Sequence, residues 1–354
     1  MGEGVQREPE RWLEPLGLLA GPVAFRAIGA GHALPLQGGN LAFSLVRLIE
    51  DGRDLGILPV ASLPDAWALQ AEALTTRPLP FAGLGAERPL VMGILNTTPD
   101  SFSDGGRHFT PDAAIAAGHA MLEAGADILD IGGESTRPGA EPVTAAEEMA
   151  RVIPVVRELA KAAPVSIDTR HAATMQAALD AGAEIINDVT ALRHDPASME
   201  LLVRSQAPVV IMHMPGTDPR GMQAQAHYED VVLEVARFLR DRVATLEALG
   251  IARARIAIDP GIGFGKTMAH NLALIEALPI LAGIGCPILL GASRKRFIGT
   301  LSGVDRAEDR LVGSVAVALA GVARGAAILR VHDVAETQQA LAVWQACATG
   351  AAPD

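Results

Sequence analysis

Cysteine, aromatic residues and net positive charge are scarce in this 354-residue sequence, and each shortage excludes a class of function. The two cysteines, Cys286 and Cys347, form no Cys-x-x-Cys motif, so we expect neither a disulfide framework nor a thiolate metal site. The 29 basic residues are outnumbered by 41 acidic ones, which gives a net charge of −12. Nucleic acids and anionic membrane surfaces need a basic partner, so we expect the chain to bind neither.

Long hydrophobic runs and targeting signals are also missing. The uncharged stretch at residues 277–293 contains two prolines and three glycines, which argues against a membrane-spanning helix. The first residues lack the basic-then-apolar pattern of a signal peptide. We therefore expect a cytoplasmic protein whose thiols are reduced.

The residues that are abundant favour a parallel sheet. Hydrophobic residues make up 49% of the chain but aromatic residues only 3%, so the core must consist mainly of Ala, Val, Leu and Ile. Parallel strands that are covered on both faces have this composition. The length suits one large α/β domain and a smaller one.

Residues 1–88 differ in composition from the rest of the chain. They predict a small α+β accessory domain of unknown role, joined to the remainder at 83–88. They are rich in Pro and Gly around one predicted helix, residues 40–50, and one short strand, residues 55–58. His32 and Trp67 are expected to be packing or surface residues rather than ligands.

From residue 89 to residue 354, apolar strands and helical stretches alternate eight times. The helix predicted over 144–161 begins with a capping box formed by Thr144 and Glu147. Eight strand–helix units in roughly 260 residues favour a closed (β/α)8 TIM barrel over an open sheet.

Each predicted barrel strand ends in a polar group that could take part in chemistry. These groups are Asn96, Glu134 with 135–137, Asp168, Asn187, His213, Asp259, 293–295, and Arg330 with His332. In a barrel the carboxyl ends of the strands meet at the catalytic face, so we expect these side chains to converge there.

The sequence partly matches a phosphate-binding P-loop and a zinc site but satisfies neither pattern. The stretch DPGIGFGKT (259–267) has Pro260 where the P-loop needs glycine, so we interpret its glycines as allowing close approach of a flat ligand, with Phe264 as a contact face. The alternative is a flexible loop with Phe264 in the core. His213 and His227 have no third ligand at zinc spacing.

Anions and Mg²⁺ fit the pattern better. Arg294, Lys295 and Arg296 follow the seventh strand, and Arg330 and His332 follow the eighth, which is the usual phosphate position of this fold. Asn96 is the kind of hard, neutral ligand that Mg²⁺ accepts beside a bound polyphosphate. The cations would also help to keep Asp168 and Asp259 ionised.

The chain resembles the dihydropteroate synthases of the pterin-binding family over residues 90–341. The resemblance rests on the motifs MGILNTTPDSFSDGG (92–106), DIGGESTRPGA (130–140), SIDT (166–169), INDV (186–189), MHM (212–214), DPGIGFGK (259–266), SRK (293–295) and RVHDV (330–334). It implies a transferase of folate biosynthesis that condenses p-aminobenzoate with 6-hydroxymethyl-7,8-dihydropterin diphosphate, releasing pyrophosphate. A homodimer is the family expectation.

The resemblance also implies a role for each matching residue. The pterin would be held by Asp168, Asn187, Asp259 and Lys295 above Met212. The diphosphate and Mg²⁺ would be bound by Asn96, Arg330 and His332. The p-aminobenzoate would lie among Phe102, Thr136, Arg137, Pro138, Phe264, Ser293 and Lys295, under loops 97–106 and 133–140. Asn96, Asp168, Lys295, Arg330 and His332 are the expected catalytic set.

Two alternatives stay open at this point. A methyltetrahydrofolate-dependent corrinoid methyltransferase shares the pterin-anchoring residues but has no use for the Arg330 and His332 pair. A catalytically silent pterin-binding or partner-binding paralogue would bind the pterin diphosphate without turnover. Because an arylamine is already nucleophilic, the reaction we favour is dissociative, with loss of diphosphate ahead of attack.

Overall fold

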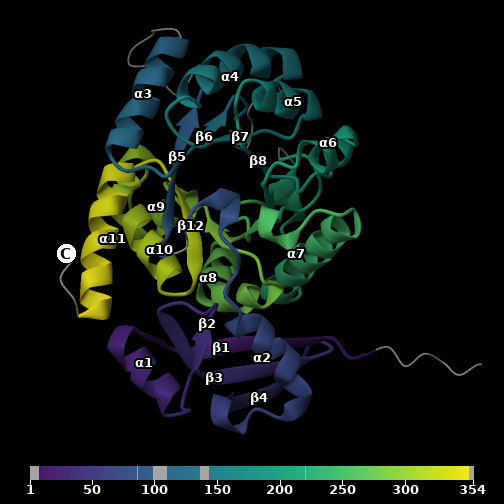
Figure 1. Cartoon of the computed structure of the whole chain (residues 1–354), viewed down its shortest axis with the longest axis vertical. Helices are drawn as coiled ribbons and strands as arrows, with labels where there is room; N and C mark the ends of the chain where they lie inside the picture. Colours follow the sequence, from purple (N-terminus) through teal and green to yellow (C-terminus); the bar gives the residue numbers. More distant parts are fainter. Residues whose placement is uncertain (1–7, 86, 99–109, 136–142, 220, 351–354) are drawn as a thin grey trace, which may run out of the picture.

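The computed structural model describes residues 8–85, 87–98, 110–135, 143–219 and 221–350. Its larger part is a closed barrel of eight parallel strands, which confirms the predicted (β/α)8 fold (Figure 1). The strands follow one another around the barrel in chain order, and β9 pairs with β10 within this ring. The barrel strands are β5 (Leu90–Asn96), β6 (Ile128–Gly132), β7 (Val165–Asp168), β8 (Ile185–Asp188), β9 (Val209–Met212), β10 (Ile256–Asp259), β11 (Ile288–Leu290) and β12 (Ala326–Val331).

An outer layer of helices covers the barrel. The helices are α3 (Pro111–Glu123), α4 (Ala145–Leu159), α5 (Ala172–Asp180), α6 (Ala197–Ser205), α7 (Val231–Ala248), α8 (Met268–Glu276), α9 (Arg296–Ser302), α10 (Leu311–Val322) and α11 (Val334–Thr349). At the start of α4, Thr144 accepts a hydrogen bond from the Glu147 amide and Glu147 accepts one from the Thr144 amide. The predicted capping box is therefore confirmed. Within the described residues, no helix has the length and apolar character needed to cross a bilayer.

Successive side chains along each barrel strand face opposite ways. Those that face outward, such as Leu129, Ile186 and Leu329, join the large hydrophobic cluster between strands and helices. Inward positions near the strand starts form a second cluster: Leu90, Met92, Ile128, Ile185, Val210, Ala257, Leu289 and Ile328. Phe81, from the segment before the barrel, packs into this inner cluster and covers the base of the barrel.

Residues 8–75 contribute an antiparallel sheet with two helices at the barrel's base (Figure 1). Its elements are β1 (Arg11–Ala20), α1 (Gly21–Gly29), β2 (Leu34–Leu36), β3 (Leu41–Glu50), β4 (Arg53–Pro59) and α2 (Ala68–Thr75). The strand predicted at 55–58 is present as part of β4. Trp67 is buried and His32 is exposed, as expected of a packing residue and a surface residue.

The helix predicted over 40–50 is wrong, because these residues form β3. Strand β1 pairs with it from Arg11 opposite Glu50 to Ala20 opposite Leu41, and β2 and β4 pair along its other edge. A short apolar run such as LAFSLVRLIE fits either a buried helix or a strand. The pairing partner on each side decides for the strand.

Contacts across the base join the accessory sheet firmly to the barrel. Trp12 and Ile49 belong to the barrel's own hydrophobic cluster, and Glu10 forms ion pairs of 2.7 Å with Arg237 and with Arg240 of α7. Gly21 has a φ of +58°, and a Cβ there would lie 2.0 Å from the Ala348 carbonyl oxygen. Glycine is thus required where α1 begins against the end of α11. The boundary at residue 88 stays a prediction.

Candidate active site

The candidate site residues occupy one layer of the barrel interior. Five of them lie two positions beyond a member of the inner cluster, so they face inward one layer closer to the carboxyl ends of the strands. The pairs are Ile128 with Asp130, Ile185 with Asn187, Val210 with Met212, Ala257 with Asp259, and Ile328 with Arg330. Asp168 ends β7 and Asn96 ends β5 at the same mouth. The predicted convergence is therefore present.

Arg330 is the centre of a buried polar network. Its Nε lies 2.6 Å from Asp130 Oδ2, and its Nη2 lies 2.6 Å from Asp168 Oδ2. Asn187 donates to the same Asp130 oxygen over 3.0 Å. The other Asp130 oxygen, Oδ1, is buried and has no hydrogen-bond partner among the described residues. This network offers a fixed acceptor to a ligand that carries N–H groups.

Burial dominates the protonation of these groups. It raises the pKa of Asp168 to about 7, although Arg330 opposes the shift, and it also raises the pKa of Asp259. Burial lowers the pKa of Lys295 to about 8, although Asp259 opposes it. Desolvation therefore outweighs the attraction of the nearby cations at both aspartates, and those cations limit the rise in each pKa.

Lys266, which we did not single out from the sequence, fixes the loop after β10. Its Nζ lies 3.0 Å from His213 Nδ1 and donates to the carbonyl oxygens of His213 and Phe264. Gly261 has a φ of +70°, and a Cβ there would lie 1.9 Å from the His213 carbonyl oxygen. The loops after β9 and β10 thus interlock.

This interlocked loop presents Phe264 to Lys295, whose Nζ lies 4.0 Å from the ring centroid. The ring packs against a small cluster that contains Met212 and Met214. Phe264 is therefore part of a wall of the site and not a member of the main core. Burial lowers the pKa of Lys266 to about 7.

The three consecutive cations of the predicted anion site, Arg294, Lys295 and Arg296, lie in different environments. Arg294 pairs with Asp333, its Nε 3.1 Å from Oδ2, and Arg296 is exposed. Lys295 alone of the three lies over Phe264 at the site. Ser293 Oγ lies 3.0 Å from His332 Nδ1 and accepts a hydrogen bond from the His332 amide, so it orients that histidine at the end of β12.

Other predicted residues are placed elsewhere or cannot be placed. Glu134 pairs with Arg170 at 2.8 Å, which leaves it a structural role beside the mouth. Phe102, Thr136, Arg137 and Pro138 lie outside the described residues. In the described part of the chain, no three His, Cys, Asp or Glu side chains are grouped so that they could hold a metal ion.

Sequence reasoning missed Asp130 as well as Lys266. Both stand inside the family motifs named above, but the sequence does not show which way their side chains point. The alternation of side chains along a strand could have identified Asp130. It lies two residues from Ile128 and from Gly132, so it faces the inward side of β6. For Lys266 no periodic signal exists, since it belongs to a loop.

The model of the pterin binding enzyme family matches residues 92–332. The dihydropteroate synthase of Neisseria meningitidis serogroup B is 52% identical over 271 residues, which are 74% of this chain and 94% of that protein. Among solved structures, the Xanthomonas albilineans dihydropteroate synthase with 4-aminobenzoic acid has a TM-score of 0.71 and 52% identity, and it covers 76% of this chain and 96% of its own. The structure of that organism's enzyme with 7,8-dihydropteroate has a TM-score of 0.69 and 49% identity, and it covers 78% and 100%.

Proposed function

The chain belongs to the pterin-binding enzyme family, and from this premise we propose how its residues carry out a dihydropteroate synthase reaction. The reaction joins p-aminobenzoate to 6-hydroxymethyl-7,8-dihydropterin diphosphate and gives 7,8-dihydropteroate and pyrophosphate. The observation that carries this function is the single inward layer of Asp130, Asp168, Asn187, Asp259 and Arg330 in a barrel that is similar to structures solved with 4-aminobenzoic acid and 7,8-dihydropteroate.

The pterin ring binds at the bottom of the mouth. Asp259 and Asn187 are 6% and 5% exposed and carry an acceptor and an amide, which match the amino and oxo edges of a pterin. Asp130 Oδ1 supplies a further acceptor. Met212 lies beneath the ring as an apolar face, and Lys295 covers it from the side of Phe264.

The diphosphate binds nearer the ends of β5 and β12, at Arg330, His332 and Asn96. Asn96 would hold Mg²⁺ there, because it offers one neutral oxygen at the end of β5, the kind of ligand that Mg²⁺ accepts beside phosphate. The ion, when bound, supplies positive charge to the departing diphosphate. Arg330 has its pKa raised by Asp130 and Asp168 against the effect of burial, so it stays charged throughout.

The arylamine binds above the pterin, beside Phe264, Ser293 and Lys295. Its nitrogen is neutral at pH 7 and attacks the exocyclic carbon without a strong base. Departure of the diphosphate runs ahead of this attack, and Asp168 and Asp259 favour the positive charge that develops on the pterin. Isotope-effect or trapping measurements that showed tightly coupled bond making and breaking would contradict this order of steps.

We also propose that the chain forms a homodimer and works in the cytoplasm. Helix α10 carries no charged residue from Leu311 to Val322, and Val312 is 78% exposed. Leu301 on α9, which contacts α10, is 56% exposed as well, and exposed apolar side chains favour an interface. Sedimentation should show a dimer that Val312→Glu converts to a monomer. A wild-type monomer at micromolar concentration would contradict this proposal.

Binding of two ligands tests the arrangement of the site. His332→Ala should weaken binding of the pterin diphosphate by about 1.5–3 kcal/mol, the scale of a charged hydrogen bond, and leave binding of the pterin without phosphates nearly unchanged. Asp259→Ala should weaken both ligands alike. The exposed His119→Ala on α3 is the matched control. Equal losses of both ligands in His332→Ala would refute the position of the diphosphate.

A further inference from the structure

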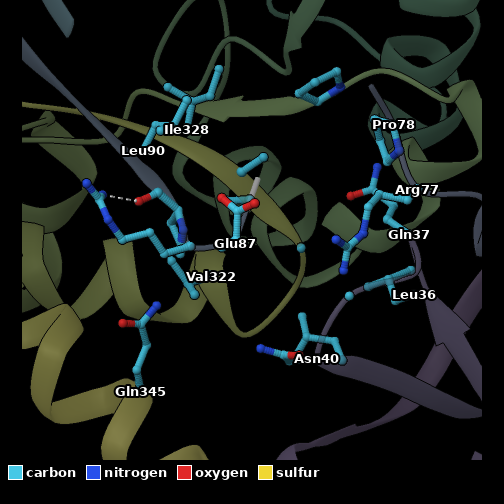
Figure 2. A pocket seen from close by; sticks show the side chains of 18 of the residues that line it. Leu36, Gln37, Asn40, Arg77, Pro78, Glu87, Leu90, Val322, Ile328 and Gln345 are labelled. Carbon is cyan, nitrogen blue, oxygen red and sulfur yellow. Dashed lines mark hydrogen bonds between the residues drawn. The ribbon is translucent and has the colours of Figure 1, made fainter. Parts of the chain in front are cut away.

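A cavity of about 190 Å³ lies between the accessory segment and the base of the barrel, at the end opposite the candidate active site (Figure 2). We call it the basal cavity and define it by Leu36, Asn40, Glu87, Leu90, Ile328 and Gln345, which all line it. Small-molecule sites often form at such junctions between domains. The family model begins only at residue 92, so Leu36 and Asn40, in the accessory sheet, lie outside the part of the chain that it matches.

The walls of the basal cavity are mainly apolar. Leu36, Leu90 and Ile328 are buried and come from β2, β5 and β12. Trp344 of α11 adds an aromatic side chain. Figure 2 shows the polar ends of Asn40 and Gln345 at one side of the same space. Such a surface accepts a flat apolar body with a polar edge.

Three charged side chains line the basal cavity, Arg77, Arg88 and Glu87, and each is held differently. Arg77 is held by the Gly38 carbonyl oxygen, with its Nη2 at 2.7 Å and its Nε at 3.2 Å. Arg88 pairs with Asp127 through two hydrogen bonds. The Glu87 carboxylate points into the space among the labelled side chains (Figure 2), and no cation pairs with it in the described part of the chain.

We propose that the basal cavity binds a small planar aromatic cation, with an amidine or amino group on Glu87 and the ring among the apolar walls. A carboxylate accepts two parallel N–H bonds from an amidine, which fixes the plane of the ligand. An anion placed against Glu87 would be repelled by it, and Arg77, which also lines the cavity, donates to the Gly38 carbonyl oxygen instead. The size of the cavity suits a single ring with one substituent.

This site is separate from the candidate active site. Leu90 and Asn96 lie at opposite ends of β5, and a strand of that length spans roughly 20 Å. Because the walls of the basal cavity come from both the accessory segment and the barrel, a bound ligand holds the two against each other. The proposal depends on this docking and not on the chemistry proposed for the mouth.

Benzamidine is the probe that tests the proposal, used with the full chain after saturation with 7,8-dihydropteroate, which blocks the active-site carboxylates. Calorimetric titration should give one benzamidine per chain, and benzoate should not bind. Glu87→Gln should weaken benzamidine about tenfold or more, since a charged hydrogen bond is lost. Glu336→Gln, which changes an exposed carboxylate on α11, should leave binding unchanged.

The same titration can overturn the proposal. Equal affinity of the wild type and Glu87→Gln, or no saturable binding to the product-loaded chain, would contradict it. Glu87 is exposed, so its replacement leaves the fold intact, and a thermal unfolding scan of each variant verifies this. Benzamidine binding is measured without turnover. A chain that binds benzamidine but releases no pyrophosphate would therefore contradict the proposed function and not the basal-cavity proposal.

Discussion

Among single residues, Arg330 has the most demanding position, because it satisfies two carboxylates at once. Asp130 is fully buried, and its partners are Arg330 and Asn187. An isolated buried charge costs far more than a paired one. The arginine is therefore required by the fold as well as by the ligand.

Removal of Arg330 should reveal this double role. Arg330→Met should lower the free energy of unfolding by about 3 kcal/mol, because it leaves Asp130 without its cation. The double variant Asp130→Asn, Arg330→Met should recover most of that loss. Urea unfolding of the four proteins of this cycle measures the coupling. Additive losses would show that the pair is not coupled.

Lys266 should make stability depend on pH. Its pKa is about 7 in the folded chain and near 10.5 when unfolded, so between these values the unfolded chain binds more protons. The free energy of unfolding should then rise with pH above 7 as the buried ammonium loses its proton. Lys266→Met, which keeps much of the length of the side chain, should show a smaller rise. Unfolding midpoints at several pH values measure this, and parallel pH curves of the two proteins would contradict it.

At the scale of elements, the sequence predicted the barrel better than it predicted the accessory segment. Eight strand–helix units repeat one pattern, so an error in any one unit is corrected by its neighbours. The β1 and β3 pair has no such repetition, and the run from Leu41 to Glu50 suits a helix equally well until its partners are known. The alternation of inward and outward side chains along β6 would have identified Asp130. Loop contacts such as those of Lys266 depend on the folded chain and have no such pattern.

The junction of β1 with α7 should be stabilised by packing and not by charge. Trp12 is 6% exposed within the barrel's cluster, so Trp12→Ala should cost about 3–5 kcal/mol of unfolding free energy. Glu10→Gln should cost less than about 1 kcal/mol, because its arginine partners are partly exposed. Chemical unfolding of both variants compares them. A larger loss in Glu10→Gln would reverse this order.

For the whole molecule, the two ends of the barrel differ in role: the base contributes to stability and the mouth holds the candidate active site. The accessory segment covers the base, where Phe81 packs into the inner cluster, while the candidate active site lies at the mouth. Stability and catalysis should therefore respond independently to changes at the two ends.

A chain that begins at Gly85 tests this separation. It should unfold at a temperature lower by about 10 °C or more, since it loses Phe81 and Trp12 from two hydrophobic clusters. Its turnover should stay within about twofold of the full chain below that temperature. Thermal scans and a pyrophosphate assay measure both. A folded but inactive truncation would assign the accessory segment a part in catalysis.

Pyrophosphate release that depends on p-aminobenzoate is the most direct test of the proposed function. The full chain should release pyrophosphate from the pterin diphosphate only when p-aminobenzoate is present. Asp259→Asn should lower kcat/KM by about 100-fold, while the exposed Asp241→Asn on α7 should leave it unchanged. No release by the wild type, or full activity of Asp259→Asn, would contradict a pterin site built from the inward layer of this barrel.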